Sequence, residues 1–177
     1  MKTDAELLKQ TITGNRQAFA ELYSRYKSEL FGYARAILRD EGLAEDVLHD
    51  TFLRLFKSGH TIRNPEVLRQ WLYVVVRRLS YDSLRWNRHA EPLNDQEPGH
   101  EPTPFEVVER KTSEEMLQDA IEHLPAVHRE VVFLREVMQL SYEEIREMTG
   151  TTLPAVKSKL FKARKVLAAV LMPYFQE

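Results

Sequence analysis

The sequence predicts an all-α fold: two small helical domains joined by a flexible acidic linker. Apolar residues recur at spacings of three and four in both halves of the chain, and no period-two strand pattern persists. Between the halves, residues 91–112 contain four prolines and carry six acidic against two basic side chains. Such a stretch can neither propagate a helix nor bury a core. We therefore place the domains at 1–89 and 113–177, with the linker at 90–112.

In the first domain we expect an antiparallel bundle of three or four helices. An apolar stripe over 19–38 predicts one long helix, and Gly42 marks the break after it. A second stripe over 47–56 predicts the next helix. A third helix follows Pro65, with its inward positions spread over 68–79.

The second domain carries the pattern of a helix-turn-helix. Two apolar stretches separated by Pro125 come first. Ser141 and Glu144 then have the S-x-x-E spacing of a capping box, Gly150 suits a helix C-terminus, and Thr152 can cap the last helix. A helix, a turn with glycine and a second helix of this length are typical of DNA-binding proteins.

Composition narrows the function classes. The chain has 177 residues, 43% of them hydrophobic and 29% charged, with no cysteine and a formal net charge of −2. These values exclude collagen, low-complexity disorder, a disulfide-stapled scaffold, thiol catalysis and cysteine-ligated zinc. Apolar runs are far shorter than the roughly 20 residues of a membrane span, and the first ten residues lack a signal-peptide core. We expect a cytoplasmic protein.

The last helix has basic residues and no acidic ones, as a helix among phosphates requires. With Leu160 turned inward, its outer and flanking faces carry side chains that can reach base edges in a major groove. These are Lys157, Ser158, Phe161 and Lys162, with Lys159, Arg164 and Lys165 adding positive charge. The alternative is a solvated basic helix with no ligand.

The third helix of the first domain also has a basic face. Arg77, Tyr81, Arg85 and Arg88 follow one another at spacings of four, four and three, and Trp71 lies more than a turn earlier. Guanidinium groups and aromatic rings both stack on unpaired bases, so this face suits a separated DNA strand. Trp71 suits a core position equally well.

A third surface lies on the helix over 44–57. Opposite its apolar stripe, Asp46, His49, Asp50 and Leu53 fall within about one quadrant at 100° per residue. An apolar anchor among acids is typical of a protein-binding patch, although singly exposed leucines are common.

For catalysis the sequence offers little. The six histidines show no metal-ligand spacing, and phosphate-binding glycine loops and G-x-S-x-G are absent. A small helical enzyme would have to use Asp46 and Asp50, one helical turn apart. We expect no catalytic residue, no metal, no cofactor and no small-molecule substrate.

Taken in order, these stretches resemble an extracytoplasmic-function (ECF) sigma factor, a group 4 member of the sigma-70 family and a promoter-recognition subunit of bacterial RNA polymerase. The likeness spans nearly the whole chain. It is carried by AEDVLHDTFLR at 44–54, RQWLY at 69–73 with DSLR at 82–85, LPAVHREV at 124–131 with LSYEEI at 140–145, and TLPAVKSKLFKAR at 152–164.

The resemblance implies a role for each surface. Core polymerase would meet Asp46, His49, Asp50, Leu53 and Arg54. In the minus-ten region of promoter DNA, a flipped base would meet Ile62, Val75 and Arg78, and the strand beside it Trp71, Arg77, Tyr81, Arg85 and Arg88. The minus-thirty-five element would meet Lys157, Ser158, Phe161 and Lys162, with Lys159, Arg164 and Lys165 on phosphates. Arg78 and Arg146 replace the family's usual Asn and Ala, and we expect the stem of Arg146 to lie along the surface with its charge in water.

The resemblance also implies an anti-sigma factor as partner, possibly membrane-anchored, which holds the protein inactive. We further expect the acids of the linker to keep the second domain off DNA in the free protein. The alternative function is a stand-alone helix-turn-helix regulator that needs no polymerase. Leu53 on its acidic face and the stripe from Arg77 to Arg88 would be superfluous in such a regulator.

Overall fold

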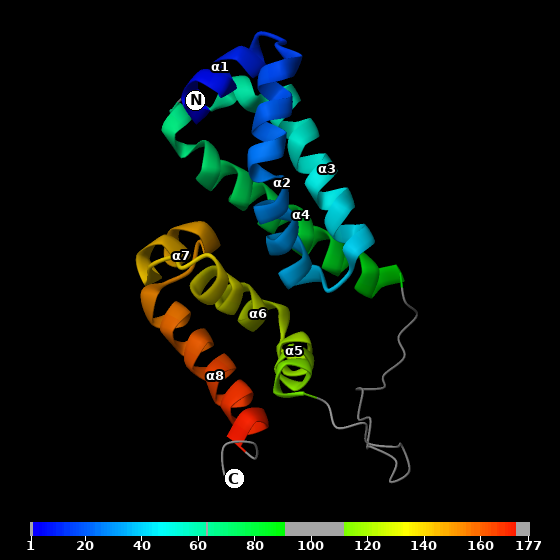
Figure 1. Ribbon diagram of the computed structural model, residues 1–177, viewed down its shortest axis with the longest axis vertical. Coiled ribbons are helices and arrows are strands. Elements are labelled where there is room, and N and C mark those ends of the chain that lie inside the picture. The colour runs from blue at the N-terminus through cyan, green and yellow to red at the C-terminus, as the bar shows by residue number, and fades with distance from the viewer. Residues whose placement is uncertain (1, 63, 91–111, 173–177) are drawn as a thin grey trace.

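The computed structural model describes residues 2–62, 64–90 and 112–172, and within them the protein is helical with no strand (Figure 1). The all-α prediction is therefore confirmed, while most of the expected linker, 91–111, lies outside the described residues. None of the helices combines the length and apolar character needed to cross a bilayer. The elements are α1 (Asp4–Ile12), α2 (Arg16–Leu38), α3 (Glu41–Ser58), α4 (Leu68–Ala90), α5 (Ser113–His123), α6 (Ala126–Val132), α7 (Tyr142–Thr149) and α8 (Leu153–Leu171), with 3-10 turns η1 (Gly59–Thr61) and η2 (Pro65–Val67) and a π-helical turn η3 (Phe133–Val137).

Helices α1–α4 form one bundle, with α2 packed against the other three. The break expected at Gly42 lies earlier. Arg39 ends α2 in the left-handed conformation (φ 62°), and the Asp40 carboxylate caps α3 by accepting from the Leu43 amide at 2.8 Å. Because Asp40 satisfies an amide of the first turn, α3 begins before Gly42 and includes it.

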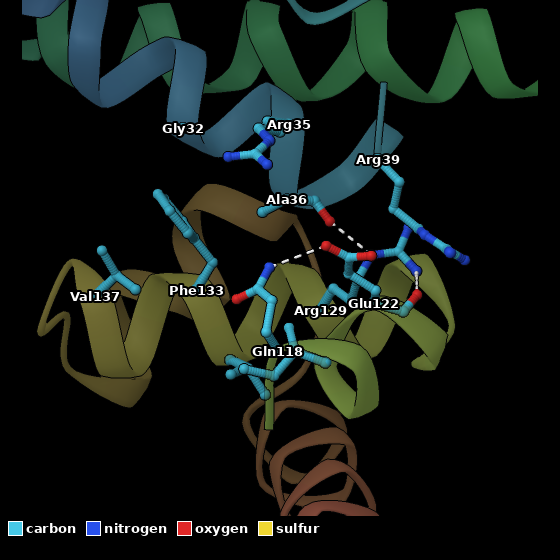
Figure 2. A pocket seen from close by; sticks show the side chains of 11 residues that line it. Gly32, Arg35, Ala36, Arg39, Gln118, Glu122, Arg129, Phe133 and Val137 are labelled. Carbon is cyan, nitrogen blue, oxygen red and sulfur yellow. Dashed lines mark hydrogen bonds between the residues drawn. The ribbon is translucent and has the colours of Figure 1, made fainter. Parts of the chain in front are cut away.

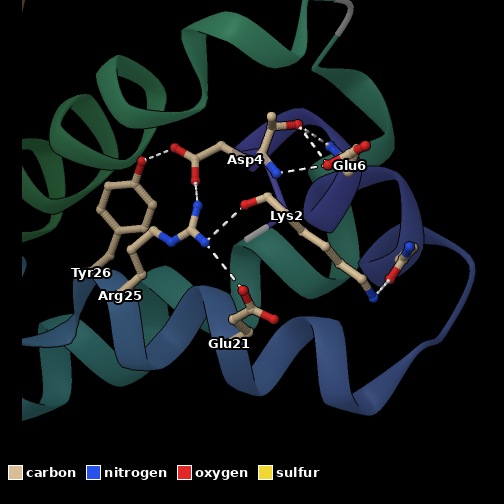
Figure 3. Close-up of polar contacts among 8 residues, drawn as sticks. Lys2, Asp4, Glu6, Glu21, Arg25 and Tyr26 are labelled. Atoms are coloured by element: carbon tan, nitrogen blue, oxygen red, sulfur yellow. Dashed lines mark hydrogen bonds and ion pairs between the residues drawn. The ribbon is translucent and has the colours of Figure 1, made fainter.

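Helix α1 is tied to α2 by a polar cluster (Figure 3). The Asp4 carboxylate accepts from both Arg25 and Tyr26, and Arg25 also pairs with Glu21 at 3.2 Å. Burial, followed by the bond to Asp4, raises the pKa of Tyr26 above its ordinary value. Helix α1 completes a four-helix group, the upper of the two numbers expected.

Helices α5–α8 form the second group, and their predicted caps are confirmed. Ser141 and Glu144 make both bonds of a capping box, at 3.2 and 2.7 Å. Gly150 ends α7 in the left-handed conformation (φ 62°), where a side chain would be strained, and Thr152 caps α8. The guanidinium of Arg146 lies at the surface, paired with Glu143 at 2.8 Å.

The two groups pack on each other through α2 against α6 and α4 against α7, so that one continuous apolar core crosses both. Gly32 permits this approach, because a Cβ there would lie 3.2 Å from the ring of Phe133. The rings of Tyr33 and Phe133 stack across the junction with centroids 6.1 Å apart. In Figure 1, α5–α8 lie along one side of the first bundle.

Candidate polymerase and nucleic-acid interfaces

The acidic face predicted on α3 exists as one exposed surface. Asp46, His49, Asp50, Leu53 and Arg54 are all exposed, while the opposite side of α3 packs into the core through residues such as Val47 and Phe52. The placement follows from the apolar stripe, which leaves only one direction for the charged residues. Among the described residues no group of three or more acidic or histidine side chains could hold a metal ion.

A groove beside this face was not expected from the sequence. It runs between α3 and α4, with Asp46 and Asp50 on one side and Leu79 and Trp86 on the other. Trp86 is 77% exposed. In the sequence, Trp86 is an aromatic residue within the arginine-rich end of the helix, and the prediction for this stretch rested on the arginines alone. The groove adds an apolar ring to the edge of the acidic face.

The residues expected around the minus-ten strand are divided by the fold. Arg78, with 75% of its side chain exposed, and Arg85 lie at the surface, and both pair with Asp82. Trp71 is half-buried against the core, in agreement with the alternative prediction of a core position. Ile62 is only 8% exposed, so this conformation offers little of it to a base. Val75 is half-buried, and Arg88 lies near the end of α4.

Arg77 and Tyr81 are half-buried and hydrogen-bonded, whereas their spacing suggested a free basic stripe. The Arg77 Nε donates to Glu130 Oε1 at 2.7 Å, the Tyr81 hydroxyl donates to Glu130 Oε2 at 2.9 Å, and the Arg77 guanidinium lies 4.8 Å from the Tyr81 ring centroid. A third donor, the Tyr33 hydroxyl, reaches Glu130 Oε1 at 2.7 Å. The physical reason is the packing of α6 onto α2 and α4, which brings a buried carboxylate to this stripe.

The electrostatics of this cluster follow from burial. Burial by itself lowers the pKa of Arg77, but the Glu130 carboxylate, together with Tyr33 and Tyr81, more than offsets this effect, and the net pKa is raised. Burial and the same carboxylate raise the pKa of Tyr81 and of Tyr33 above the ordinary value for a phenol. Arg77 therefore stays charged and both hydroxyls stay protonated, so all three remain donors to Glu130.

A second polar contact joins the groups at Arg129. Its guanidinium donates to the carbonyl oxygens of Ala36 and Ile37 at 2.8 and 2.7 Å, in the last turn of α2. It also donates to the backbone carbonyl oxygen of Leu124 and, at 3.3 Å, to that of Glu122. The α2 carbonyls have no partner within their own helix, and a cation at a helix C-terminus is favourable. Figure 2 shows Arg129 below α2, beside a cavity of about 280 Å³ between the two groups.

The outer side of α8 presents the residues predicted for the major groove. Leu160 is buried, and Lys157, Ser158 and Lys162 are exposed together with Phe161, which is 69% exposed. Of the three predicted phosphate contacts, Lys165 is exposed and Lys159 is half-buried. The third, Arg164, is exposed and pairs with Glu136 at 2.7 Å. All the sequence-predicted residues of α8 except Lys159 are therefore exposed.

His128 of α6 lies within the electrostatic reach of this basic face. Partial burial, and then the charges of Lys162 and Lys159, lower the pKa of His128 below its ordinary value of 6.5. A neutral imidazole thus borders the lysines. No sequence pattern distinguishes this histidine, because the influence of α8 on α6 depends on how the helices of the group pack.

Comparison with known proteins places both halves of the chain in one family. Residues 22–90 match Sigma-70 region 2, and residues 114–167 match Sigma-70, region 4. The ECF RNA polymerase sigma factor SigM of Mycobacterium tuberculosis is 29% identical over 175 residues, covering 96% of this chain and 85% of that protein. The RNA polymerase sigma factor SigV of Bacillus subtilis is 26% identical over 146 residues, covering 80% of this chain and 84% of that protein.

The fold agrees with these matches. The sigma factor RpoE of Bartonella quintana, solved in complex with the anti-sigma factor NepR, superposes with a TM-score of 0.66 at 20% identity, over 87% of this chain and 96% of that one. Sigma factors are initiation factors rather than enzymes in the usual sense. The chain therefore belongs to the sigma-70 family as an ECF sigma factor, an alternative subunit that directs RNA polymerase to promoters.

Proposed function

We propose that α3 binds core polymerase, that α4 holds the minus-ten strand, and that α8 reads the minus-thirty-five element. The observation that supports this division best is the α3 face, where Asp46, Asp50 and Leu53 are exposed together on a helix whose other side is core. An exposed apolar residue ringed by charge is what a protein partner covers. A regulator that acted alone would have no use for it.

On α4, Arg78 and Arg85 lie at the surface and would exchange Asp82 for a strand. Arg77 and Tyr81 require the second group to move first. Extruding a base costs a few kcal/mol, which stacking and hydrogen bonds must offset. Trp71 and Val75 are half-buried and precede Arg78 on the same helix. Ile62 supports the loop before α4 from within the core.

On α8, Lys157, Ser158, Phe161 and Lys162 would meet base edges, with the Phe161 ring against a thymine methyl group. Lys159, Arg164 and Lys165 would neutralise phosphates. Arg164 would exchange Glu136 for a phosphate, a substitution of one anion for another.

An anti-sigma factor is the regulator that we assign to this chain, since the RpoE relative of the same fold was solved with one. That regulator could be membrane-anchored. We place the sigma factor itself in the cytoplasm, where core polymerase and promoter DNA are found.

Binding of the purified protein to bacterial core RNA polymerase tests the proposal. The double variant Asp50→Arg, Leu53→Glu should lose at least about 100-fold in affinity, because it reverses a charge and removes the apolar anchor. Glu147→Arg is the matched control for charge reversal, since Glu147 is exposed on α7, outside the α3 face. Circular dichroism verifies that the variants are folded. Equal binding by both variants, or duplex DNA binding with no polymerase binding at all, would favour the stand-alone regulator.

A further inference from the structure

Glu130 is a fully buried carboxylate whose hydrogen-bond donors all come from the other helical group. Among the described residues its side chain accepts from Tyr33 of α2 and from Arg77 and Tyr81 of α4. Its own group supplies no further side-chain donor among the hydrogen bonds of the described residues. The Glu130 carboxylate therefore accepts these hydrogen bonds only while α6 is packed against the first bundle.

That dependence makes Glu130 unlike an ordinary core residue. A buried charge that loses its partner costs several kcal/mol, whereas the same charge exposed to water costs little. Closed, the carboxylate is held by three donors, and opened, it is solvated. The Glu130 charge therefore costs little free energy in either state. An intermediate state, with Glu130 still buried and Arg77 withdrawn, costs much more.

The donors gathered on Glu130 are also the donors that a nucleic-acid backbone uses. Arginine and hydroxyl side chains bind phosphate oxygens in the same way as carboxylate oxygens, and such contacts position a protein on DNA. Arg77 and Tyr81 are two of the residues to which we assign the minus-ten strand. The further inference rests on that proposed function.

We propose that Glu130 takes the place of a promoter phosphate, so that the second helical group and the minus-ten strand compete for Arg77 and Tyr81. In the free protein, Glu130 thereby blocks Arg77 and Tyr81 from binding the DNA strand. Single-stranded DNA and closure of the two groups exclude each other at this point. Arg78 and Arg85, which stay at the surface, remain able to make the first contact with a strand.

The competition is intramolecular, which explains how one carboxylate can oppose a polyanion. Arg129 holds α6 to the end of α2 through two carbonyl oxygens and keeps Glu130 near its donors (Figure 2). A tethered group acts at a high effective concentration. A strand bound through Arg78 and Arg85 must displace both contacts to gain Arg77 and Tyr81.

The test compares wild type with Glu130→Gln, which keeps the shape of the side chain and removes its charge. The probe is a fluorescent single-stranded DNA 12-mer of mixed sequence, bound by the free protein at low salt. We expect Glu130→Gln to bind it at least about tenfold more tightly. Glu147→Gln is the matched control, because Glu147 is exposed in the same group and its loss changes the net charge equally. An equal gain in both variants would reduce the effect to net charge and overturn the proposal.

A second measurement keeps the test decisive if Glu130→Gln fails to fold. The chain has no cysteine, so cysteines placed at the exposed positions Ser24 and Ala168 can carry a donor and acceptor dye. Adding the 12-mer to the labelled protein with Glu130 intact should change energy transfer, because the strand and the closed arrangement exclude each other. Saturation with the 12-mer at unchanged energy transfer would refute the competition.

Failure of the inference can be told from failure of the proposed function. Arg77→Gln should slow promoter opening by the holoenzyme on a promoter selected from a random library. Glu130→Gln should leave that rate as in wild type, because the holoenzyme is already open. If Arg77→Gln has no effect there, the assignment of Arg77 to the strand is wrong. If it slows opening while Glu130→Gln leaves the free protein unchanged, only the competition is wrong.

Discussion

Replacing Arg129 by methionine should uncouple the two helical groups. The guanidinium is buried and donates to four carbonyl oxygens, two in α2 and two at the end of α5. Burial, and then the charge of Arg39, lower the pKa of Arg129, so the residue lies in a place where a cation is costly unless its bonds are made. Methionine fills similar space and makes none of them.

The size of the effect follows from these bonds. A hydrogen bond from a charged donor contributes about 1.5–3 kcal/mol, so four bonds give a gross loss of roughly 6–12 kcal/mol. Part of this is recovered, because Arg129 borders the cavity between the groups, and water entering it can bind the freed carbonyls. We expect a net loss of about 3–5 kcal/mol.

Urea unfolding followed by two signals measures this loss. Both tryptophans, Trp71 and Trp86, lie in α4, so their fluorescence reports the first group alone, and circular dichroism reports both groups. In Arg129→Met the dichroism transition should begin about 1 M urea or more below the fluorescence transition. Arg146→Met is the control, since an exposed ion pair contributes about 1 kcal/mol or less. Coincident transitions within 1 kcal/mol of wild type would refute the coupling role.

Four further outcomes are expected. Gly32→Leu should lower the thermal stability by about 1–3 kcal/mol, because its side chain would enter the space of Phe133; an unchanged melting curve would contradict this contact. Ser141→Ala should cost about 1 kcal/mol in urea unfolding through the lost cap. Phe161→Ala should weaken binding to a selected minus-thirty-five duplex while stability stays within about 0.5 kcal/mol. Burial, and then the lysines of α8, lower the pKa of His128 below 6.5, and phosphates that neutralise the lysines would raise this pKa again. DNA binding should therefore take up a proton at pH values around and below about 6.5; affinity should rise as the pH falls through that range, and His128→Gln should flatten the dependence.

Local chemistry was readable from the sequence wherever a residue acts on its own neighbours. The cap at Ser141 and the turn at Gly150 depend on side chains and backbone within a few residues, so their spacing was sufficient. The break predicted at Gly42 was misplaced, because Asp40 caps the first turn of α3 and the helix therefore begins before Gly42. Leu53 and Phe161 were correctly placed at the surface, since periodicity fixes the side of a helix.

Contacts between the groups were not readable in the same way. Tyr33 and Glu130 meet although they are 97 residues apart, and no period within either helix relates them. The spacing of Arg77 and Tyr81 predicted a shared face correctly but could not say what covers it. An acid beside Arg129 within an apolar stretch was the one available hint, because buried charges are rare without partners.

The closed molecule is asymmetric: α6 and η3 pack toward the first bundle, and α8 lies farther from that bundle than α6 (Figure 1). The basic side chains on the outer side of α8 are exposed. Chromosomal duplex far exceeds any single promoter in amount, and non-specific attraction to it needs only exposed lysines. Wherever the linker acids do not hold α8 off DNA, the free subunit should therefore reside along the chromosome through α8 while its strand-binding helix stays covered. The pool that polymerase can recruit would then be set by cellular ionic strength as well as by synthesis, and encounters would occur by one-dimensional sliding beside the promoters themselves.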